Sequence, residues 1–149
     1  MSNSAFGFKR PEDSPGLLLW QTTTTWQRLI KSALAEYDIS HPQFVILAIL
    51  LWFTEKGEDP TQIAIIRLSK LDKMTVSQSL KKLCKQDLVV RAEHEQDTRA
   101  KSVHLTQQGQ TLAAKLVKII EKIDADFFGQ LTQSEGESLV QVLGVLNSK

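Results

Sequence analysis

The sequence predicts a mainly α-helical protein with one small β-hairpin, and three observations support this fold class. Apolar residues recur every three or four positions through most of the 149-residue chain, which is typical of amphipathic helices. Helix-start patterns, a Ser or Thr followed three residues later by Gln or Glu, occur at Ser40 and Thr132. Segments 88–91 and 102–105 have strand character, with a polar stretch between them. A chain that is 42% hydrophobic can bury a core as one domain, with or without a separate dimerisation element.

The N-terminal third predicts a loose arm and two helices. Residues 1–15 are mostly polar and contain two prolines, so we expect an arm whose Phe6 and Phe8 can pack onto a partner subunit. Residues 16–37 have helical apolar spacing. A second helix, capped by Ser40 and running to about Lys56, is apolar almost all round and should be buried on most sides. Residues 57–60 then break the helical pattern.

The next two predicted helices each have a buried apolar side, and the second also has a distinctive polar side. Residues 61–69 form the first, with Ile65, Ile66 and Leu68 pointing inward. The second covers residues 75–86, and Val76, Leu80 and Leu83 form its buried stripe. Its outward side carries hydroxyl, amide and ammonium groups but no carboxylate: Thr75, Gln78, Lys82 and Lys85, flanked by Ser77, Ser79, Lys81 and Gln86. Such groups contact base edges and phosphates in DNA, although an ordinary solvated helix face is the alternative.

The hairpin after this helix has a charged tip that no core would accept. Arg99 and Lys101 lie in this tip, and an arginine there can enter a narrow minor groove, where the negative potential is deepest. Asp97 can hold Arg99 in position through a charge-assisted hydrogen bond. Considered alone, the tip is better interpreted as a solvated loop.

Three sequence runs together resemble the MarR (multiple-antibiotic-resistance repressor) family of winged helix-turn-helix regulators. They are Leu71-Asp72-Lys73-Met74-Thr75-Val76-Ser77-Gln78, Asp97-Thr98-Arg99-Ala100-Lys101 and Leu105-Thr106-Gln107-Gln108-Gly109. The resemblance covers nearly the whole chain after about residue 16. It implies a homodimer that binds near-palindromic double-stranded DNA, with helix 75–86 in the major groove and Arg99 in the minor groove.

The resemblance also implies a division of the chain and a set of DNA contacts. Residues 1–15 would be a flexible arm, 16–40 and 106–149 dimerisation helices, and 41–105 the winged helix-turn-helix lobe. We expect base contacts from Thr75, Ser77, Gln78 and Ser79, phosphate contacts from Lys73, Lys81, Lys82 and Arg91, and wing contacts from Asp97, Arg99 and Lys101. The net charge is only +1, but residues 67–101 carry nine Lys or Arg against five Asp or Glu.

The chain departs from the family pattern at two positions. The family usually has glycine where this chain has Asp87, and often glycine where it has Lys70. Asp tolerates a left-handed backbone better than most residues, so the cost should be about 1 kcal/mol or less. Neither departure touches the predicted DNA-facing residues.

Two further helices are predicted beyond the hairpin, and they should leave apolar surface uncovered. Thr106 caps the first, which continues to Phe127, and Thr132 with Glu135 begins the second. Their apolar stripes would be exposed in a monomer. Dimerisation together with the first helix is the natural way to cover them.

Enzyme, metal and membrane functions find little support in the sequence. There is no phosphate-binding glycine loop and no catalytic set with recognisable spacing, so we expect no enzyme activity and no cofactor. His41, His94 and His104 are too scattered for a metal site. Cys84 is the only cysteine, and Lys81 and Lys85 near it leave a redox role open beside a structural one. The longest apolar run is too short to span a bilayer, and we expect a cytoplasmic protein.

The sequence therefore predicts a homodimeric, sequence-specific DNA-binding regulator, more often a repressor than an activator, that a small-molecule effector can release. Trp20, Trp26, Tyr37, His41, Trp52 and Phe53 are candidates for the effector pocket, although aromatic residues at helical spacing more often belong to a core. The alternative function is a winged-helix module that binds a protein partner through the same helix, without sequence-specific DNA binding.

Overall fold

The computed structural model describes residues 3–58, 60–93 and 101–148, which form six α-helices, one short 3-10 helix and a two-stranded antiparallel sheet. In chain order the elements are η1 (Pro11–Asp13), α1 (Pro15–Ala35), α2 (His41–Glu55), α3 (Gln62–Ser69), α4 (Lys73–Lys85), β1 (Val89–Glu93), β2 (Lys101–Leu105), α5 (Gln107–Phe128) and α6 (Gln133–Leu146). The mainly helical fold with a small hairpin is confirmed, and the predicted helix ends lie within two residues of the observed ones.

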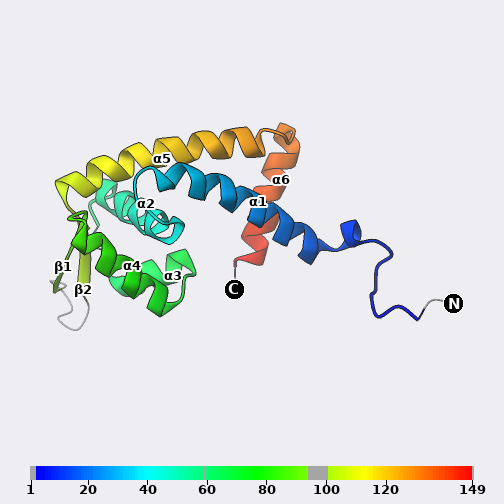
Figure 1. The fold of residues 1–149 in the computed structure, drawn as a ribbon, viewed down its shortest axis with the longest axis horizontal. Coiled ribbons are helices and arrows are strands. Elements are labelled where there is room, and N and C mark those ends of the chain that lie inside the picture. The colour runs from blue at the N-terminus through cyan, green and yellow to red at the C-terminus, as the bar shows by residue number, and fades with distance from the viewer. Residues whose placement is uncertain (1–2, 59, 94–100, 149) are drawn as a thin grey trace.

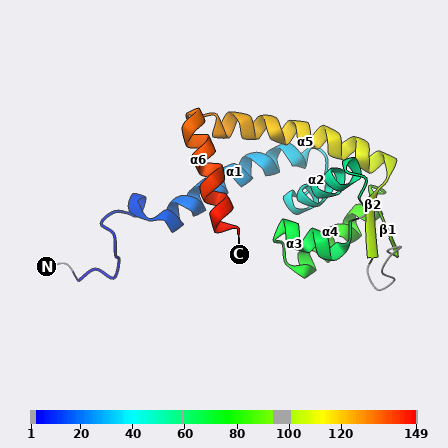
Figure 2. The same ribbon diagram turned by 180° about the vertical axis from the view of Figure 1, so that it is seen from behind.

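The elements divide into a lobe and two long helices, α1 and α5, that extend from it. Figure 1 shows α1 and α5 side by side, with α2, α3, α4 and the hairpin gathered at one end as a lobe (residues 41–105). The view from behind in Figure 2 shows α6 turning back from the end of α5 that is far from the hairpin. The chain before η1 extends away from the rest of the molecule in both views.

Side-chain caps explain where most of the helices begin. Ser40 and Gln43 form a capping box, since the Gln43 N–H donates to Ser40 Oγ and the Ser40 N–H donates to Gln43 Oε1. Thr132 and Glu135 form a second capping box, as predicted. Thr106 caps α5 by accepting from the Gly109 N–H at 2.9 Å. These local rules gave accurate helix starts because each depends on residues only three positions apart.

The core is centred on α2, which contacts α1, α3, α4, α5 and β2. Its Ile46, Leu47 and Leu50 are fully buried, as the apolar composition of this helix predicted. They meet buried side chains from every neighbouring element, namely Ile30, Leu34, Ile65, Val76, Leu80, Leu83, Val103 and Leu116. The stripe predicted on α4 is therefore confirmed.

The inward prediction for Leu68 on α3 was wrong. Leu68 is 57% exposed, whereas Ile65 is fully buried and Ile66 is half-buried. The covered face of α3 consists of positions 62, 65, 66 and 69, which follow the three- and four-residue spacing of one helical stripe. Leu68 lies beside this stripe and points away from α2.

Two non-glycine residues adopt the left-handed backbone for which the family uses glycine. Lys70 at the end of α3 and Asp87 after α4 both have φ of 60°. At Asp87 the chain reverses so that the Leu88 N–H donates to Leu83 O at 3.0 Å, which closes the helix. The turn geometry thus persists without glycine, at a cost of about 1 kcal/mol for each position.

Gly109 allows α5 to begin directly against the start of β1. A Cβ at this position would lie 1.9 Å from Leu88 O, closer than any side chain permits. The Thr106 N–H donates to the same carbonyl at 3.0 Å, and Thr106 Oγ1 donates to Asp87 O at 2.6 Å. The end of the α4 segment is therefore tied to the beginning of α5.

Candidate nucleic-acid interface

The N-terminus of α4 is ordered by its cap residue, Asp72. Its carboxylate accepts from the Thr75 N–H at 2.7 Å and from the Thr75 hydroxyl at 2.9 Å. These two hydrogen bonds hold the pKa of Asp72 below its usual value. The Thr75 hydroxyl proton is thus used within the protein, and its oxygen keeps lone pairs that can accept a further hydrogen bond.

The exposed face of α4 carries most of the predicted DNA contacts on one surface. Lys73, Ser77, Gln78, Lys81 and Lys82 are all exposed, while Val76, Leu80 and Leu83 face the core. Among the described residues, neither Lys73 nor Lys81 lies within ion-pair distance of a carboxylate, and Lys82 Nζ lies 3.7 Å from Asp38 Oδ1. The face offers hydroxyl, amide and cationic groups without an acidic side chain of its own.

The side chains of Ser79 on α4 and of Gln86 at its C-cap do not point toward the predicted DNA-facing surface. Ser79 is only 9% exposed and lies on the covered side between Val76 and Leu83, so it is unavailable for the predicted base contact. Gln86 was expected beside the DNA-facing side chains, but its side chain turns toward the α1–α2 turn and donates to Asp38 O at 3.1 Å. The spacing of positions 76, 79, 80 and 83 already places Ser79 within the buried stripe of the helix, whereas the direction of the Gln86 side chain depends on its contact with the α1–α2 turn.

The hairpin predicted as a wing is present and anchored to the lobe. In its ladder Val89 pairs with Leu105, Arg91 with Val103 and Glu93 with Lys101. The Val103 N–H also donates to Pro60 O at 3.0 Å, which joins β2 to the segment before α3. Arg99, which is predicted to enter the minor groove, and Asp97, which is predicted to orient it, lie outside the described residues.

Arg91 links the hairpin to α4. Its side chain is half-buried, and Nη2 donates to Ser77 O at 3.3 Å. Its Nε is buried and has no hydrogen-bond partner within the described part of the chain. The guanidinium therefore lies directly beside Ser77, on the same side of the lobe as the exposed lysines of α4.

The aromatic residues proposed as an effector pocket do not gather at one site. Trp20 is 71% exposed on α1 and Trp52 is 61% exposed at the end of α2, with Lys56 Nζ 4.8 Å from its ring. Trp26 and His41 do meet edge to face, with ring centroids 5.3 Å apart. The role of these residues in an effector site stays a prediction.

The Trp26–His41 pair belongs to the junction between α1, α2 and α5. Trp26 Nε1 donates to Asp124 Oδ1 at 2.7 Å, which joins α1 to α5. Burial lowers the pKa of His41, the Lys31 charge lowers it further, and Asp124 acts in the opposite direction. The indole N–H has a hydrogen-bond partner and the imidazole ring is largely covered, so the pair is part of the packing between these helices.

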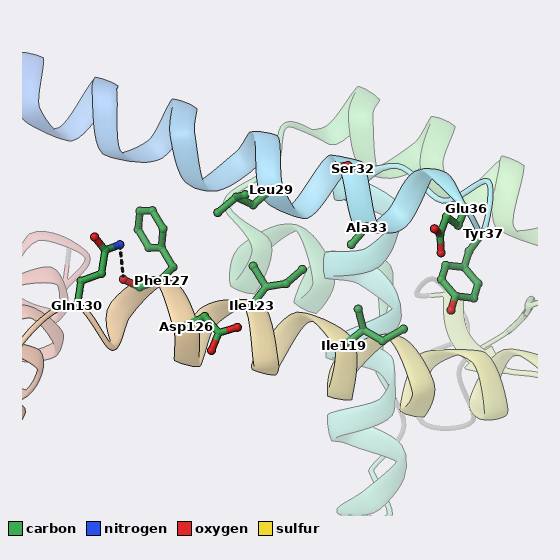
Figure 3. A pocket seen from close by; sticks show the side chains of 10 residues that line it. All are labelled: Leu29, Ser32, Ala33, Glu36, Tyr37, Ile119, Ile123, Asp126, Phe127 and Gln130. Carbon is green, nitrogen blue, oxygen red and sulfur yellow. Dashed lines mark hydrogen bonds between the residues drawn. The ribbon is translucent and has the colours of Figure 1, made fainter.

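Tyr37 instead lines an open pocket between α1 and α5, with a volume of about 590 Å³. Figure 3 shows its apolar walls, to which Leu29 and Ala33 contribute from α1 and Ile119, Ile123 and Phe127 from α5. Glu36 and Asp126 add carboxylates to the lining. Only Tyr37 is shared with the set predicted from the sequence.

Several apolar side chains on α6 and on the first half of α1 are exposed in the described part of the chain. Helix α6 contributes no buried residue, and its Val140, Val145 and Leu146 are each at least 66% exposed. On α1, Leu19 is 54% exposed near Trp20. These are the surfaces on which the sequence predicts dimerisation.

Other classes of site were also sought among the described residues. No group of three or more His, Cys, Asp or Glu side chains there could hold a metal ion. Within the same ranges no helix is both long enough and apolar enough to cross a membrane. Cys84 is a free, half-buried thiol on α4.

Comparisons with known proteins agree with this geometry. A family model described as the ArnR1-like winged-helix domain matches residues 35–123. The chain is 38% identical to the uncharacterized HTH-type transcriptional regulator YdcH of Bacillus subtilis, over 86% of this chain and 87% of YdcH. It is 32% identical to the HTH-type transcriptional regulator MgrA of Staphylococcus aureus, over 73% of this chain and 70% of MgrA.

Solved structures show the same fold. The DNA complex of Staphylococcus aureus MepR superposes with a TM-score of 0.80 at 25% identity, covering 91% of this chain and 96% of MepR. Bordetella bronchiseptica BpsR, whose DNA binding is regulated by 6-hydroxynicotinic acid, gives a TM-score of 0.83 at 21% identity, covering 96% and 99%. The chain therefore belongs to the MarR type of winged-helix transcriptional regulators, and it is a DNA-binding regulator and not an enzyme.

Proposed function

We propose that this protein is a homodimeric repressor that binds a near-palindromic DNA operator. The observation that carries the proposal is the exposed face of α4, where lysines surround Ser77 and Gln78 and no acidic side chain intervenes. A helix of this kind enters the major groove, where amide and hydroxyl groups read base edges and ammonium groups bind phosphates. Two such helices in a dimer would contact half-sites about 34 Å apart.

The residues predicted to contact DNA have separate proposed roles. Thr75, Ser77 and Gln78 contact bases, and Lys73, Lys81, Lys82 and Arg91 contact phosphates. The Lys82–Asp38 pair is solvent-exposed and contributes only about 0–1 kcal/mol, so Lys82 can turn to a phosphate. Ser79 is left out because it is buried. Arg99, oriented by Asp97, and Lys101 remain the proposed wing contacts.

The uncovered apolar residues of α1 and α6 support the dimer. Exposed valine and leucine side chains along a whole helix are uncommon in a monomer and mark an interaction surface. A twofold dimer would cover the same patch on both copies. It would also place the two α4 helices in one assembly, as a palindromic operator requires, in the cytoplasm where we expect the protein to act.

We also propose that a small-molecule effector releases the DNA. Its candidate site is the α1–α5 pocket of Figure 3, whose volume of about 590 Å³ lies within the usual range for ligand sites. A ligand there can weaken DNA binding only by the difference between its affinities for the DNA-bound and DNA-free arrangements.

The wing is tested by selecting bound sequences from random duplex DNA at near-physiological salt, followed by titration of the selected site. Arg99→Ala should weaken binding by about 1–3 kcal/mol and relax the preference for a narrow minor groove. An unchanged affinity would remove Arg99 from the mechanism. If a folded dimer enriches no sequence at all, the alternative of a protein-interaction module is favoured.

A further inference from the structure

A chain of side-chain amides connects the end of α4 to the turn between α1 and α2. The Ser40 N–H donates to Gln43 Oε1 at 2.9 Å, Gln43 Nε2 donates to Gln86 Oε1 at 2.8 Å, and Gln86 Nε2 donates to Asp38 O at 3.1 Å. We refer to these three hydrogen bonds as the amide bridge. They run in one direction, so each amide uses its oxygen as acceptor and its nitrogen as donor.

The bridge runs from the interior of the protein at Gln43 to the surface at Asp38. Gln43 is only 1% exposed and is the only fully buried glutamine among the described residues. A buried amide is tolerated because its oxygen and nitrogen both have partners, and loss of either partner leaves a polar group without water. Gln86, at the C-cap of α4, is the residue whose two hydrogen bonds join the two segments.

The bridge holds the C-terminal end of α4, so a change in the bridge can displace the DNA-facing residues of this helix. The α1–α2 turn is where the helix proposed for dimerisation enters the lobe, and Asp38 in that turn has φ of 55°. At 1.5 Å per residue α4 is about 20 Å long, so a tilt of about 5° at its C-terminus moves its N-terminus by about 2 Å. Such a shift exceeds the distance range of a hydrogen bond to a base edge, which is only about 0.5 Å.

Apolar packing cannot provide the same restraint. Leu80 and Leu83 hold α4 against the core, but burial of apolar surface has no preferred direction and tolerates small rotations. Amide hydrogen bonds fix both distance and angle. Lys82, which pairs with Asp38 at 3.7 Å, adds a weaker tie to the same turn.

We propose that Gln86 is a positioning residue: through the amide bridge it holds the recognition helix at a set orientation to α1, and so determines which half-site spacing the dimer accepts. This inference rests on the proposed function. Gln86 itself touches no DNA in this account. Its loss should therefore change the preference for spacing without changing the preference for bases within a half-site.

The experiment compares wild type, Gln86→Met and Gln110→Met, in which the same substitution is made at an exposed position on α5. Affinities are measured for the selected operator, for operators with one base pair added or removed between the half-sites, and for one with a changed base in each half-site. In Gln86→Met the preference for the best spacing should fall about three- to tenfold, as expected for loss of hydrogen bonds that define an orientation. The base preference should stay at the wild-type value, and Gln110→Met should match wild type throughout.

Hydrogen exchange at the Ser40 amide provides a measurement that needs no DNA. This N–H donates to Gln43 Oε1, so its exchange should accelerate in Gln86→Met when the Gln43 amide is free to rotate. If Gln86→Met fails to fold, Gln86→Asn takes its place in the experiment, because the asparagine side chain is polar but too short to form the bridge.

The outcomes separate this inference from the proposed function. Faster exchange with a reduced spacing preference supports it. Unchanged exchange, an unchanged spacing preference, or an equal loss at every spacing overturns the positioning role. If wild type itself selects no DNA sequence, the proposed function fails, and the exchange measurement still decides whether the amide bridge restrains the α1–α2 turn.

Discussion

The lobe and helix α6 bury their apolar residues to very different degrees. In the lobe, Leu47, Leu50, Ile65 and Leu80 are fully covered by neighbouring elements of the same chain. Helix α6 has a comparable supply of valine and leucine, yet none of its residues is buried. The lobe therefore shares one continuous core with α1 and α5, whereas α6 has apolar side chains that the described part of the chain leaves exposed.

Among the tests of this comparison, the largest effect on stability is expected from Leu47→Ala in α2. Leu47 is fully buried, so the substitution should lower the free energy of unfolding by about 2–5 kcal/mol through lost burial and the cavity left behind. Leu68→Ala removes the same atoms from a side chain that is 57% exposed and should cost about 1 kcal/mol or less. Urea denaturation measures both, and equal losses would mean that Leu68 is also covered.

Two glycines give the second test: Gly109, where α5 contacts Leu88 of the lobe, and Gly144 on α6. Gly109→Ala should destabilise the protein by about 1–3 kcal/mol, because the new methyl group meets Leu88 O and the backbones must separate. Gly144→Ala on α6 meets no atom within 4 Å and should stabilise the helix by about 0.5–1 kcal/mol. Thermal unfolding measures both the expected loss of stability in Gly109→Ala and the expected gain in Gly144→Ala. A large loss from Gly144→Ala would place another protein surface against α6.

The smallest effect on folding is expected from Leu146→Ser on α6. Leu146 is 67% exposed, so unfolding of the lobe should change by about 0.5 kcal/mol or less. Self-association should nevertheless weaken about tenfold, because this side chain belongs to the surface proposed for the dimer. Sedimentation at several concentrations separates the two effects, with Gln141→Ser on α6 as the control. Unchanged association would exclude Leu146 from the dimer surface.

The sequence alone determined the features that depend on nearby residues. The caps at Ser40, Thr106 and Thr132 and the buried stripe of α4 were predictable because their partners lie within one or two helical turns. The lysine-rich face of α4 was predictable for the same reason, since helical periodicity places those residues together. The left-handed turns at Lys70 and Asp87 were expected from the positions at which the family uses glycine.

Only the tertiary structure decided how those faces are used. Leu68 is exposed and the six aromatic residues are dispersed, because these outcomes depend on how each helix is rotated against its neighbours. The amide bridge joins positions 43 and 86, and no local pattern relates residues so far apart in the chain. Periodicity states which residues share a face of one helix, but contact between faces is set by packing among all the helices together, since burial is optimised over the whole core.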